Sequence, residues 1–193
     1  MVILLVLLPF LPGPGFLSGL TNIIFSLAQI SSFLGLILVP VGFIWLFVEV
    51  QKKEKIKTLP ILMCTVPVLA FVFSFWISDY ARDYSRTFAI NNAENLIKAI
   101  EKYNYVNKHY PYSLAQLAPK YVNSISKPWV MGISGYDYKK NDDGFNLSFT
   151  QDVLLGFNYE VVVFDSNGNH KAEGELTTLY PTENRNWKYY IYD

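Results

Sequence analysis

Cysteine is almost absent from this sequence: among its 193 residues only Cys64 is a cysteine, and it stands in an apolar run. One cysteine cannot form an intramolecular disulfide, so cysteine usage says nothing about the redox compartment. A lone cysteine in such a run is expected to be a small packing residue.

Charge is scarce in the first part of the chain. Residues 1–78 contain six charged residues, all between Glu49 and Lys57, and no lysine or arginine precedes Lys52. The other 115 residues contain 12 basic and 14 acidic residues, so the neutral total averages two unlike parts. The second part has no basic excess, which excludes the electrostatic footprint of a nucleic-acid-binding protein.

Catalytic motifs are also lacking. The sequence contains no G-x-S-x-G or S-x-x-K motif, no glycine-rich phosphate loop and no dinucleotide fingerprint. His109 and His170 are far apart in sequence, and neither has a partner at metal-ligand spacing. We therefore expect a protein that is not an enzyme.

Two long apolar runs predict a membrane anchor. The runs at residues 22–49 and 59–78 each supply the about 20 apolar residues that a membrane-spanning helix needs. The loop between them, residues 51–58, has four lysines and one glutamate, and short basic loops of this kind stay in the cytoplasm. We therefore expect residues 1–78 to anchor the protein in the lipid bilayer of a bacterial inner membrane. Residues 79–193 would form a domain on its periplasmic or extracellular side.

Residues 1–15 are apolar but are interrupted by Pro9, Pro12 and Pro14. A secretory signal would have a basic start, which this segment lacks. The segment is either a short lead-in that re-enters or lies at the membrane interface, or a first spanning helix broken at its prolines.

A long helix is expected to link the anchor to the domain. Apolar residues recur three and four positions apart from Phe88 to Ile100, and the helical pattern covers residues 59–107, roughly 70 Å at 1.5 Å per residue. Pro111 ends the pattern, and Ser113 is placed to cap a second, short helix. Charged residues at helical spacing predict ion pairs on an exposed turn: Asp79, Arg82, Asp83 and Arg86.

Beyond Trp129 the pattern changes to period-two alternation with turn signals, which is typical of strands. Helix and strands are segregated in sequence, so the expected fold class is α+β, with one long N-terminal helix on an antiparallel sheet. Strands are expected at 136–140, 145–149, 157–164, 170–180 and 186–193, with hairpin turns at 141–144 and 165–169.

Residues 88–150 carry a series of short motifs in a fixed order. The helix ends in Tyr110-Pro111, and four motifs follow: Ser-Leu-x-x-Leu (113–117), Pro-Lys-Tyr-Val (119–122), Lys-Pro-Trp (127–129) and a Tyr-x-Tyr strand (136–138) facing an Asp-Gly-Phe hairpin (143–145). This order resembles the globular part of type II secretion pseudopilins of the major, protein-G-like kind. The resemblance implies a pilin-like fold and a place in a secretion or cell-envelope assembly.

The prepilin leader of that family is not present. Gly15-Phe16 matches the family's cleavage junction, but no charge precedes it, and Leu20 stands where the family has a glutamate. The globular region also follows the second apolar run rather than the first. The resemblance therefore implies a pilin-like domain on a multi-span anchor and does not imply a filament subunit.

One candidate cation site lies in the turn at 165–169. Asp165, Asn167 and Asn169 place oxygen-bearing side chains at alternate positions around a glycine, a pattern that can bind Ca²⁺. The family resemblance also implies calcium binding in a loop after the sheet. The flanking strands fit a plain hairpin turn better, with no metal or cofactor.

Tyrosine is frequent in the second part of the chain. Its large apolar face and polar tip favour protein contacts, although it is also an ordinary strand residue. The candidate interaction surface consists of Tyr110, Tyr112, Tyr136 and Tyr138.

These observations predict a non-enzymatic, membrane-anchored, pseudopilin-like protein that acts through protein–protein contact. Its partners would be other envelope or secretion proteins, or a second copy of itself. The alternative is an extracytoplasmic ligand-sensing or peptide-binding module that signals through the membrane helix. That alternative requires a concave pocket ringed by tyrosines.

Overall fold

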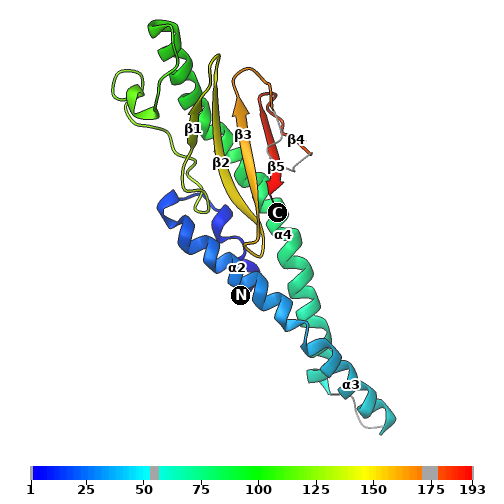
Figure 1. Ribbon diagram of the computed structural model, residues 1–193. Coiled ribbons are helices and arrows are strands. Elements are labelled where there is room, and N and C mark those ends of the chain that lie inside the picture. Colours follow the sequence, from blue (N-terminus) through cyan, green and yellow to red (C-terminus); the bar gives the residue numbers. More distant parts are fainter. Residues whose placement is uncertain (1, 53–56, 171–177, 193) are drawn as a thin grey trace.

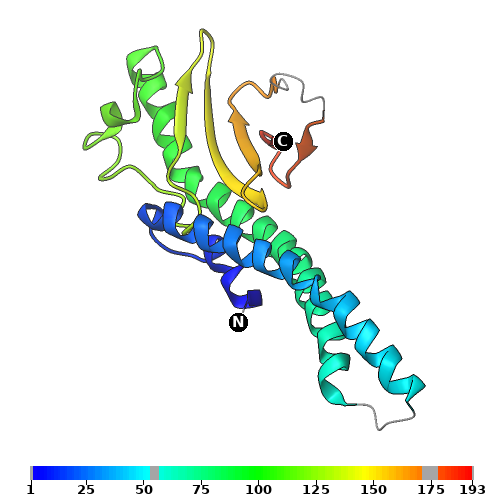
Figure 2. The ribbon, with the colours of Figure 1, turned by 60° about the horizontal axis from the view of Figure 1, so that its bottom comes forward.

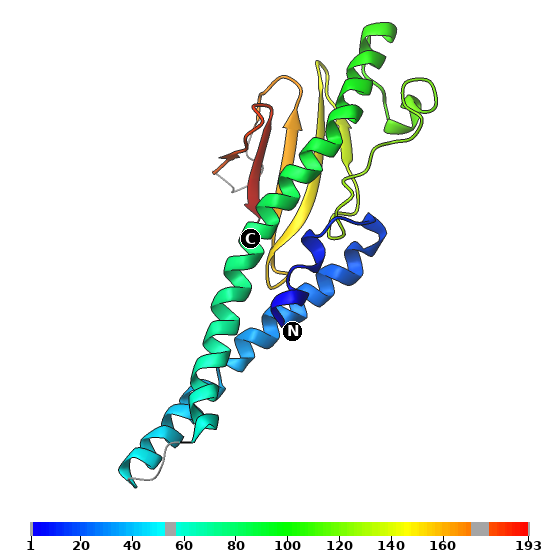
Figure 3. The same cartoon turned by 180° about the vertical axis from the view of Figure 1, so that it is seen from behind.

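The computed structural model describes residues 2–52, 57–170 and 178–192. One helix, α4 (Thr58–Asn107), runs through the length of the molecule, and an antiparallel sheet packs on its C-terminal half (Figure 1). Figure 3, the view from behind, shows α4 lying across one face of the sheet. The predicted α+β arrangement, a long helix on an antiparallel sheet, is confirmed.

The 50 residues of α4 match the helix predicted over residues 59–107. The helix ends at Lys108, which has the left-handed conformation (φ 63°) and whose backbone N–H donates to the carbonyl of Asn104 at 2.8 Å. Such a residue terminates a helix because the next backbone N–H groups turn back on the last carbonyls. Pro111 follows and cannot continue the helical ladder.

Within the described residues the sheet has five strands in the order β1-β2-β3-β5-β4, all antiparallel. They are β1 (Asp137–Lys140), β2 (Phe145–Leu154), β3 (Asn158–Asp165), β4 (Tyr180–Pro181) and β5 (Trp187–Tyr192). The predicted turn between β1 and β2 is confirmed, with the N–H of Asn141 donating to the carbonyl of Gly144 at 2.9 Å. The strand predicted at 170–180 falls mostly on residues outside the described ranges, and β4 is the part of it that the structure describes.

The core lies between α4 and the inward face of the sheet. Side chains of strands alternate between two faces, so β2 buries Phe145, Leu147 and Phe149 on one side. The helix contributes small and aliphatic residues at helical spacing, which lets α4 lie close to the strands. The other buried members of this core include Ala89, Ala93, Leu96, Ile100, Leu117, Val162, Phe164 and Trp187.

The predicted second helix is shorter and tighter than expected. Residues Leu114–Leu117 form a 3-10 turn, η3, and Ser113 makes no side-chain capping hydrogen bond. Ser113 does occupy the N-cap position, as predicted, but its side chain does not cap the turn. The side chain of Gln116 instead accepts the backbone N–H of Tyr112 at 2.7 Å, so the turn is closed from its other end.

In the part of the chain that the structure describes, two helical stretches are long and apolar enough to cross a membrane: residues 15–51 and α4. The first stretch contains α2 (Ser18–Gly35) and α3 (Leu38–Gln51), separated by a turn at Leu36–Ile37. Figure 2 shows α2 and α3 running antiparallel to α4. The hydroxyls of Ser32 and Ser74 lie 3.3 Å apart across this helical hairpin.

The closed end of the hairpin is fastened by Glu49. Its carboxylate accepts the indole N–H of Trp45 at 2.8 Å and the backbone N–H of Lys57 at 2.9 Å. The side chain of Glu49 is almost fully buried. The bond from Trp45 lies within α3, whereas the bond from Lys57, whose ammonium also lies 3.8 Å from the carboxylate, holds the end of α3 against the start of α4.

The segment before α2 folds back against the sheet domain. It consists of α1 (Val2–Leu5) and the 3-10 turns η1 (Leu8–Phe10) and η2 (Gly15–Leu17). Three backbone hydrogen bonds join it to residues 129–132: Gly13 N–H to Trp129 O at 3.0 Å, Met131 N–H to Leu11 O at 3.0 Å and Gly132 N–H to Pro9 O at 2.6 Å. The segment is therefore a folded lead-in, since its one α-helix has only four residues.

Candidate functional site

The sequence-predicted tyrosine surface is mostly turned inward. The hydroxyl of Tyr136 donates to the carbonyl of Ala89 at 2.5 Å, and that of Tyr138 donates to the carbonyl of Pro111 at 2.8 Å. Burial raises the pKa of Tyr136, and burial together with neighbouring phenols and Glu101 raises the pKa of Tyr138 to about 12. These side chains hold the sheet to α4 and to the segment after it.

Tyr110 is packed against the domain, whereas Tyr112 lies at the surface. The ring of Tyr110 packs on Phe145 with centroids 5.2 Å apart, and its hydroxyl lies 3.3 Å from the carboxylate of Glu101. Burial, then the charge of Glu101, raises the pKa of Tyr110. Tyr112 is 74% exposed, and the ammonium of Lys140 lies 4.1 Å from its ring centroid. Of the four predicted tyrosines, Tyr112 alone presents most of its surface to solvent.

The candidate calcium turn is closed by its own backbone. The Oδ1 atom of Asp165 accepts the backbone N–H groups of Asn167 at 2.8 Å and Asn169 at 3.2 Å. Gly168 has φ 72°, a conformation that glycine adopts without strain. The described residues contain no group of three or more His, Cys, Asp or Glu side chains placed to hold a metal ion. The geometry is that of a turn closed by an aspartate side chain. The prediction that this turn belongs to a hairpin is wrong, because both edges of β3 are occupied, by β2 and by β5.

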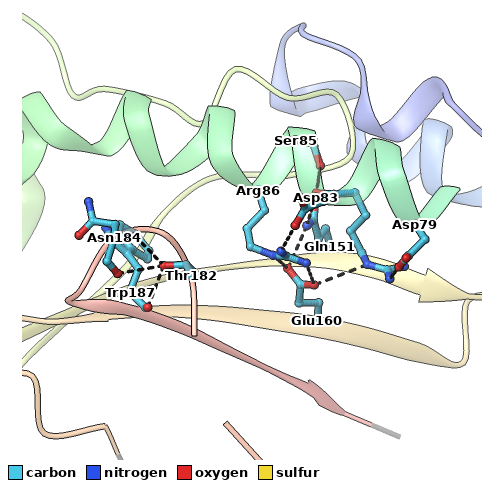
Figure 4. A network of polar contacts seen from close by, with 10 residues as sticks. Asp79, Asp83, Ser85, Arg86, Gln151, Glu160, Thr182, Asn184 and Trp187 are labelled. Carbon is cyan, nitrogen blue, oxygen red and sulfur yellow. Dashed lines mark hydrogen bonds and ion pairs between the residues drawn. The ribbon is translucent and has the colours of Figure 1, made fainter. Parts of the chain in front are cut away.

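A buried charge network joins α4 to the sheet (Figure 4). Glu160 on β3 is fully buried, and its two oxygens accept Arg86 Nε at 2.7 Å and Nη2 at 2.6 Å. The Nε atom of Arg82 lies 3.5 Å from the same carboxylate. Gln151, which pairs with Glu160 across β2 and β3, donates to the carboxylate at 3.0 Å and accepts the hydroxyl of Ser85 at 2.6 Å.

The two arginines were expected on an exposed turn, and this expectation is wrong. The predicted ion pairs Asp79–Arg82 and Asp83–Arg86 do form, but both arginines are buried and the aspartates lie at the rim. Burial acts to lower the pKa of Arg86, but the hydrogen bonds and charge of Glu160 outweigh it, so the pKa is raised. The guanidinium also lies 3.8 Å from the ring centroid of Tyr189.

This network fastens α4 to the sheet, because its main ion pair joins the helix to β3. Arg86 binds both oxygens of the Glu160 carboxylate, whereas Arg82 Nε lies 3.5 Å away and makes no hydrogen bond. The signal for the network is present in the sequence. Glu160 and Gln151 stand at inward positions of the period-two pattern, where β2 and β3 otherwise place apolar residues.

An aromatic stripe runs along the face of α4 that the sheet leaves open. It consists of Trp76, Tyr80, Tyr84 and Phe88, four residues apart, and the first three are more than half exposed. Ring centroids are 5.1 Å apart for Trp76 and Tyr80 and 6.3 Å apart for Tyr84 and Phe88. Sequence reasoning missed this stripe, although its spacing of four was visible.

The stripe continues into a hollow beside the segment before β1. The hollow has a volume of about 310 Å³, and its lining includes Phe88, Trp129, Asn91, Asn92 and Asn95. Trp129 is half exposed and has φ 55°, held in place by a backbone hydrogen bond from Gly13. The aromatic surface thus extends from the apolar half of α4 to the sheet domain.

No protein-family model matches this chain, and no curated protein or solved structure is significantly similar to it. The resemblance of residues 88–150 to pseudopilins therefore stays a prediction made from the motifs themselves.

Proposed function

We propose that this protein is a membrane-anchored, non-enzymatic, pilin-like protein whose α+β domain acts by contact with other envelope or secretion proteins. The observation that carries the proposal is the continuity of α4, which passes unbroken from an apolar helical hairpin into the core of the sheet domain. Its 50 residues correspond to about 75 Å, whereas the hydrocarbon core of a bilayer is about 30 Å thick. The second half of the helix remains for the domain.

The charges at the two ends of the apolar half support an orientation. Lys52 and Lys57 flank the closed end of the hairpin, and Asp79 is the first charged residue after it on α4. The uncharged stretch at 58–78 corresponds to about 31 Å, which matches the bilayer. Basic loops stay in the cytoplasm, so the sheet domain lies on the outer face of a bacterial inner membrane.

The aromatic stripe is the contact surface that this function uses. The stripe begins in the apolar half of α4 and continues beside the sheet. A partner that covers its whole length must therefore be apolar where it lies in the bilayer, and must present aromatic or aliphatic side chains where it lies above the bilayer. A helix of another membrane protein has that chemistry, and exposed tryptophan and tyrosine are favoured anchors of protein contacts. We assign the stripe to such a helix.

The pilin-like part of the proposal is supported by elements inside the resembling region. The long helix ends just before Tyr110-Pro111, and the hairpin of β1 and β2 follows with the Asp-Gly-Phe motif at its turn. The turn at 165–169 is closed by backbone N–H groups that donate to Asp165, and no cofactor is part of the proposed function.

Site-specific photo-crosslinking in living cells tests this function. A benzophenone side chain replaces Tyr84 within the stripe, and the adducts are identified by mass spectrometry. The expected result is an adduct with another membrane protein of the envelope or secretion machinery, or with a second copy of this chain.

Two further positions act as controls. Tyr105 is 77% exposed near the end of α4 and off the stripe, so it should give no specific adduct. Tyr112 tests the surface predicted from sequence. An adduct at position 105 as strong as that at position 84, or no protein adduct at position 84, would refute the proposal that the stripe is a protein-contact surface.

A further inference from the structure

The face of α2 that points away from the rest of the molecule is apolar and exposed. Residues three and four positions apart make up this α2 outer face: Phe16, Leu20, Ile23, Leu27, Ile30 and Leu34. The opposite face of the helix is buried and includes Phe25, Ala28 and Gln29. No charged residue occurs among residues 1–48, so this face has no ionic contact to offer a partner.

The apolar surface of α2 and α3 is longer than a bilayer is thick. From Phe16 to Val48 the two helices extend about 48 Å, compared with about 30 Å of hydrocarbon. The excess lies beside the sheet domain: Thr21 donates to the carbonyl of Met131 at 3.2 Å, and Asn22 donates to that of Gly132 at 3.2 Å. In an upright molecule this apolar length would stand in water.

The turn between β2 and β3 is a second apolar surface at the same place. Residues 153–158 carry no charge, and Phe157 at the turn is 74% exposed. The turn is fixed to α2, because the backbone N–H of Leu155 donates to Gln29 Oε1 at 2.6 Å and a Cβ on Gly156 would lie 2.6 Å from Ser26 Oγ. Figure 1 shows this end of the sheet directed toward α2 and the apolar half of α4.

We propose that the α2 outer face and Phe157 form a second lipid-contact surface, on which the domain rests in the outer leaflet. The molecule tilts toward α2, since tilting is how a bilayer accommodates a hydrophobic length greater than its own thickness. Lipid is the occupant because the surface is continuous with the exposed apolar residues of α3, including Phe43, Ile44 and Phe47. This inference rests on the proposed function in taking the bilayer as the setting of α3 and α4.

Fluorescence quenching by lipids tests the surface in the full chain. In a Cys64→Ala background, single cysteines are introduced as Leu20→Cys and Phe157→Cys and carry an environment-sensitive dye. The protein is placed in nanodiscs whose lipids bear a nitroxide either near the top or near the end of the acyl chain, so that both shallow and deep positions can be quenched. Leu69→Cys, half exposed in the middle of the apolar part of α4, is the embedded control, and Tyr112→Cys is the control in water.

The inference predicts that nitroxide lipids reduce the fluorescence at positions 20 and 157 several-fold more than at 112, as they do at 69. If position 69 is quenched and either 20 or 157 behaves like 112, the lipid surface is refuted while the membrane anchor stands. If position 69 is not quenched, the anchor fails and this inference fails with it.

Discussion

Glu160 is the residue on which the contact between α4 and the sheet depends most. It carries a buried negative charge that two buried arginines and Gln151 surround. Removing one partner of such a group leaves the opposite charge desolvated and unpaired, which costs far more than the intact network contributes.

Glu160→Ala should destabilise the folded protein by about 3–5 kcal/mol, because Arg82 and Arg86 would lose their buried counter-charge. Thermal unfolding of the full chain in detergent, followed by tryptophan fluorescence, measures the change. Glu94→Ala is the matched control. The Glu94–Lys98 ion pair has the same 2.7 Å distance as the bond from Arg86 Nε to Glu160, but both of its side chains are about two-thirds exposed. Equal losses in the two variants would show that the buried network is not the fastening described above.

Tyr138 makes stability depend on alkaline pH. Its pKa is raised from 10.0 to about 12, mainly by burial, so the folded state keeps a proton that the unfolded chain loses. A group with a raised folded pKa contributes its full stability below the unfolded value. That contribution is lost as the pH rises from about 10 toward 12.

Tyr138→Phe should lower stability near neutral pH by about 0.5–1.5 kcal/mol, through loss of the hydrogen bond to Pro111, and should flatten the alkaline decline. The melting temperature measured between neutral and alkaline pH checks both effects. Tyr112→Phe, at an exposed position, should retain the wild-type decline. Parallel declines in the wild type and the Tyr138 variant would contradict the assignment.

Single residues show where sequence reasoning stops. Alternation in β3 was readable, but nothing in one sequence says that a glutamate at an inward position has two arginines opposite it. The tyrosines show the reverse problem. Tyr136 and Tyr138 use their hydroxyls on backbone carbonyls of Ala89 and Pro111, and such contacts depend on how α4 lies across the sheet.

The lead-in, residues 2–17, packs so closely against the sheet domain that residue 132 has no room for a side chain. A Cβ on Gly132 would lie 2.6 Å from the Cβ of Pro9 and 2.7 Å from its carbonyl oxygen. A real Cβ atom does not come this close to atoms to which it is not bonded, so a side chain at this position has to displace the lead-in. Gly135, three residues later, has no neighbour within 4 Å of such a Cβ.

Gly132→Ala should release the lead-in from residues 129–132 while the sheet stays folded. Hydrogen–deuterium exchange is the measurement, and we expect faster exchange of the Gly13 and Met131 amides, which are bonded across this contact. Gly135→Ala should exchange like the wild type. Unchanged protection in Gly132→Ala would contradict the packing of the lead-in.

The elements that the sequence predicted correctly are those formed by residues close together in the chain. α4 followed from helical spacing and the Tyr-Pro break, and the hairpin of β1 and β2 followed from alternation around Asp143-Gly144. The lead-in was left with two interpretations, because its position depends on backbone hydrogen bonds to residues more than 100 positions away. At the start of η3, Ser113 occupies the predicted N-cap position, but the side-chain hydrogen bond there is made by Gln116.

At the scale of the whole molecule, one helix ties an apolar hairpin to a sheet domain. The lead-in and the N-terminal half of α2 also contact that domain, so the two parts meet along more than α4. A movement of the hairpin would therefore reach the sheet through α4 and through the turn between β2 and β3. The division into a part poor in charge and a part rich in it was readable from composition, but this second contact was not.

The central claim is that α4 carries the domain across a membrane to its outer face. Fusions of alkaline phosphatase, which folds only outside the cytoplasm, test it most directly in a bacterial host. A fusion after Tyr192 should be active, and a fusion after Lys57, in the loop between α3 and α4, should be inactive. An inactive fusion at 192 together with an active one at 57 would place the domain inside the cell and contradict the account.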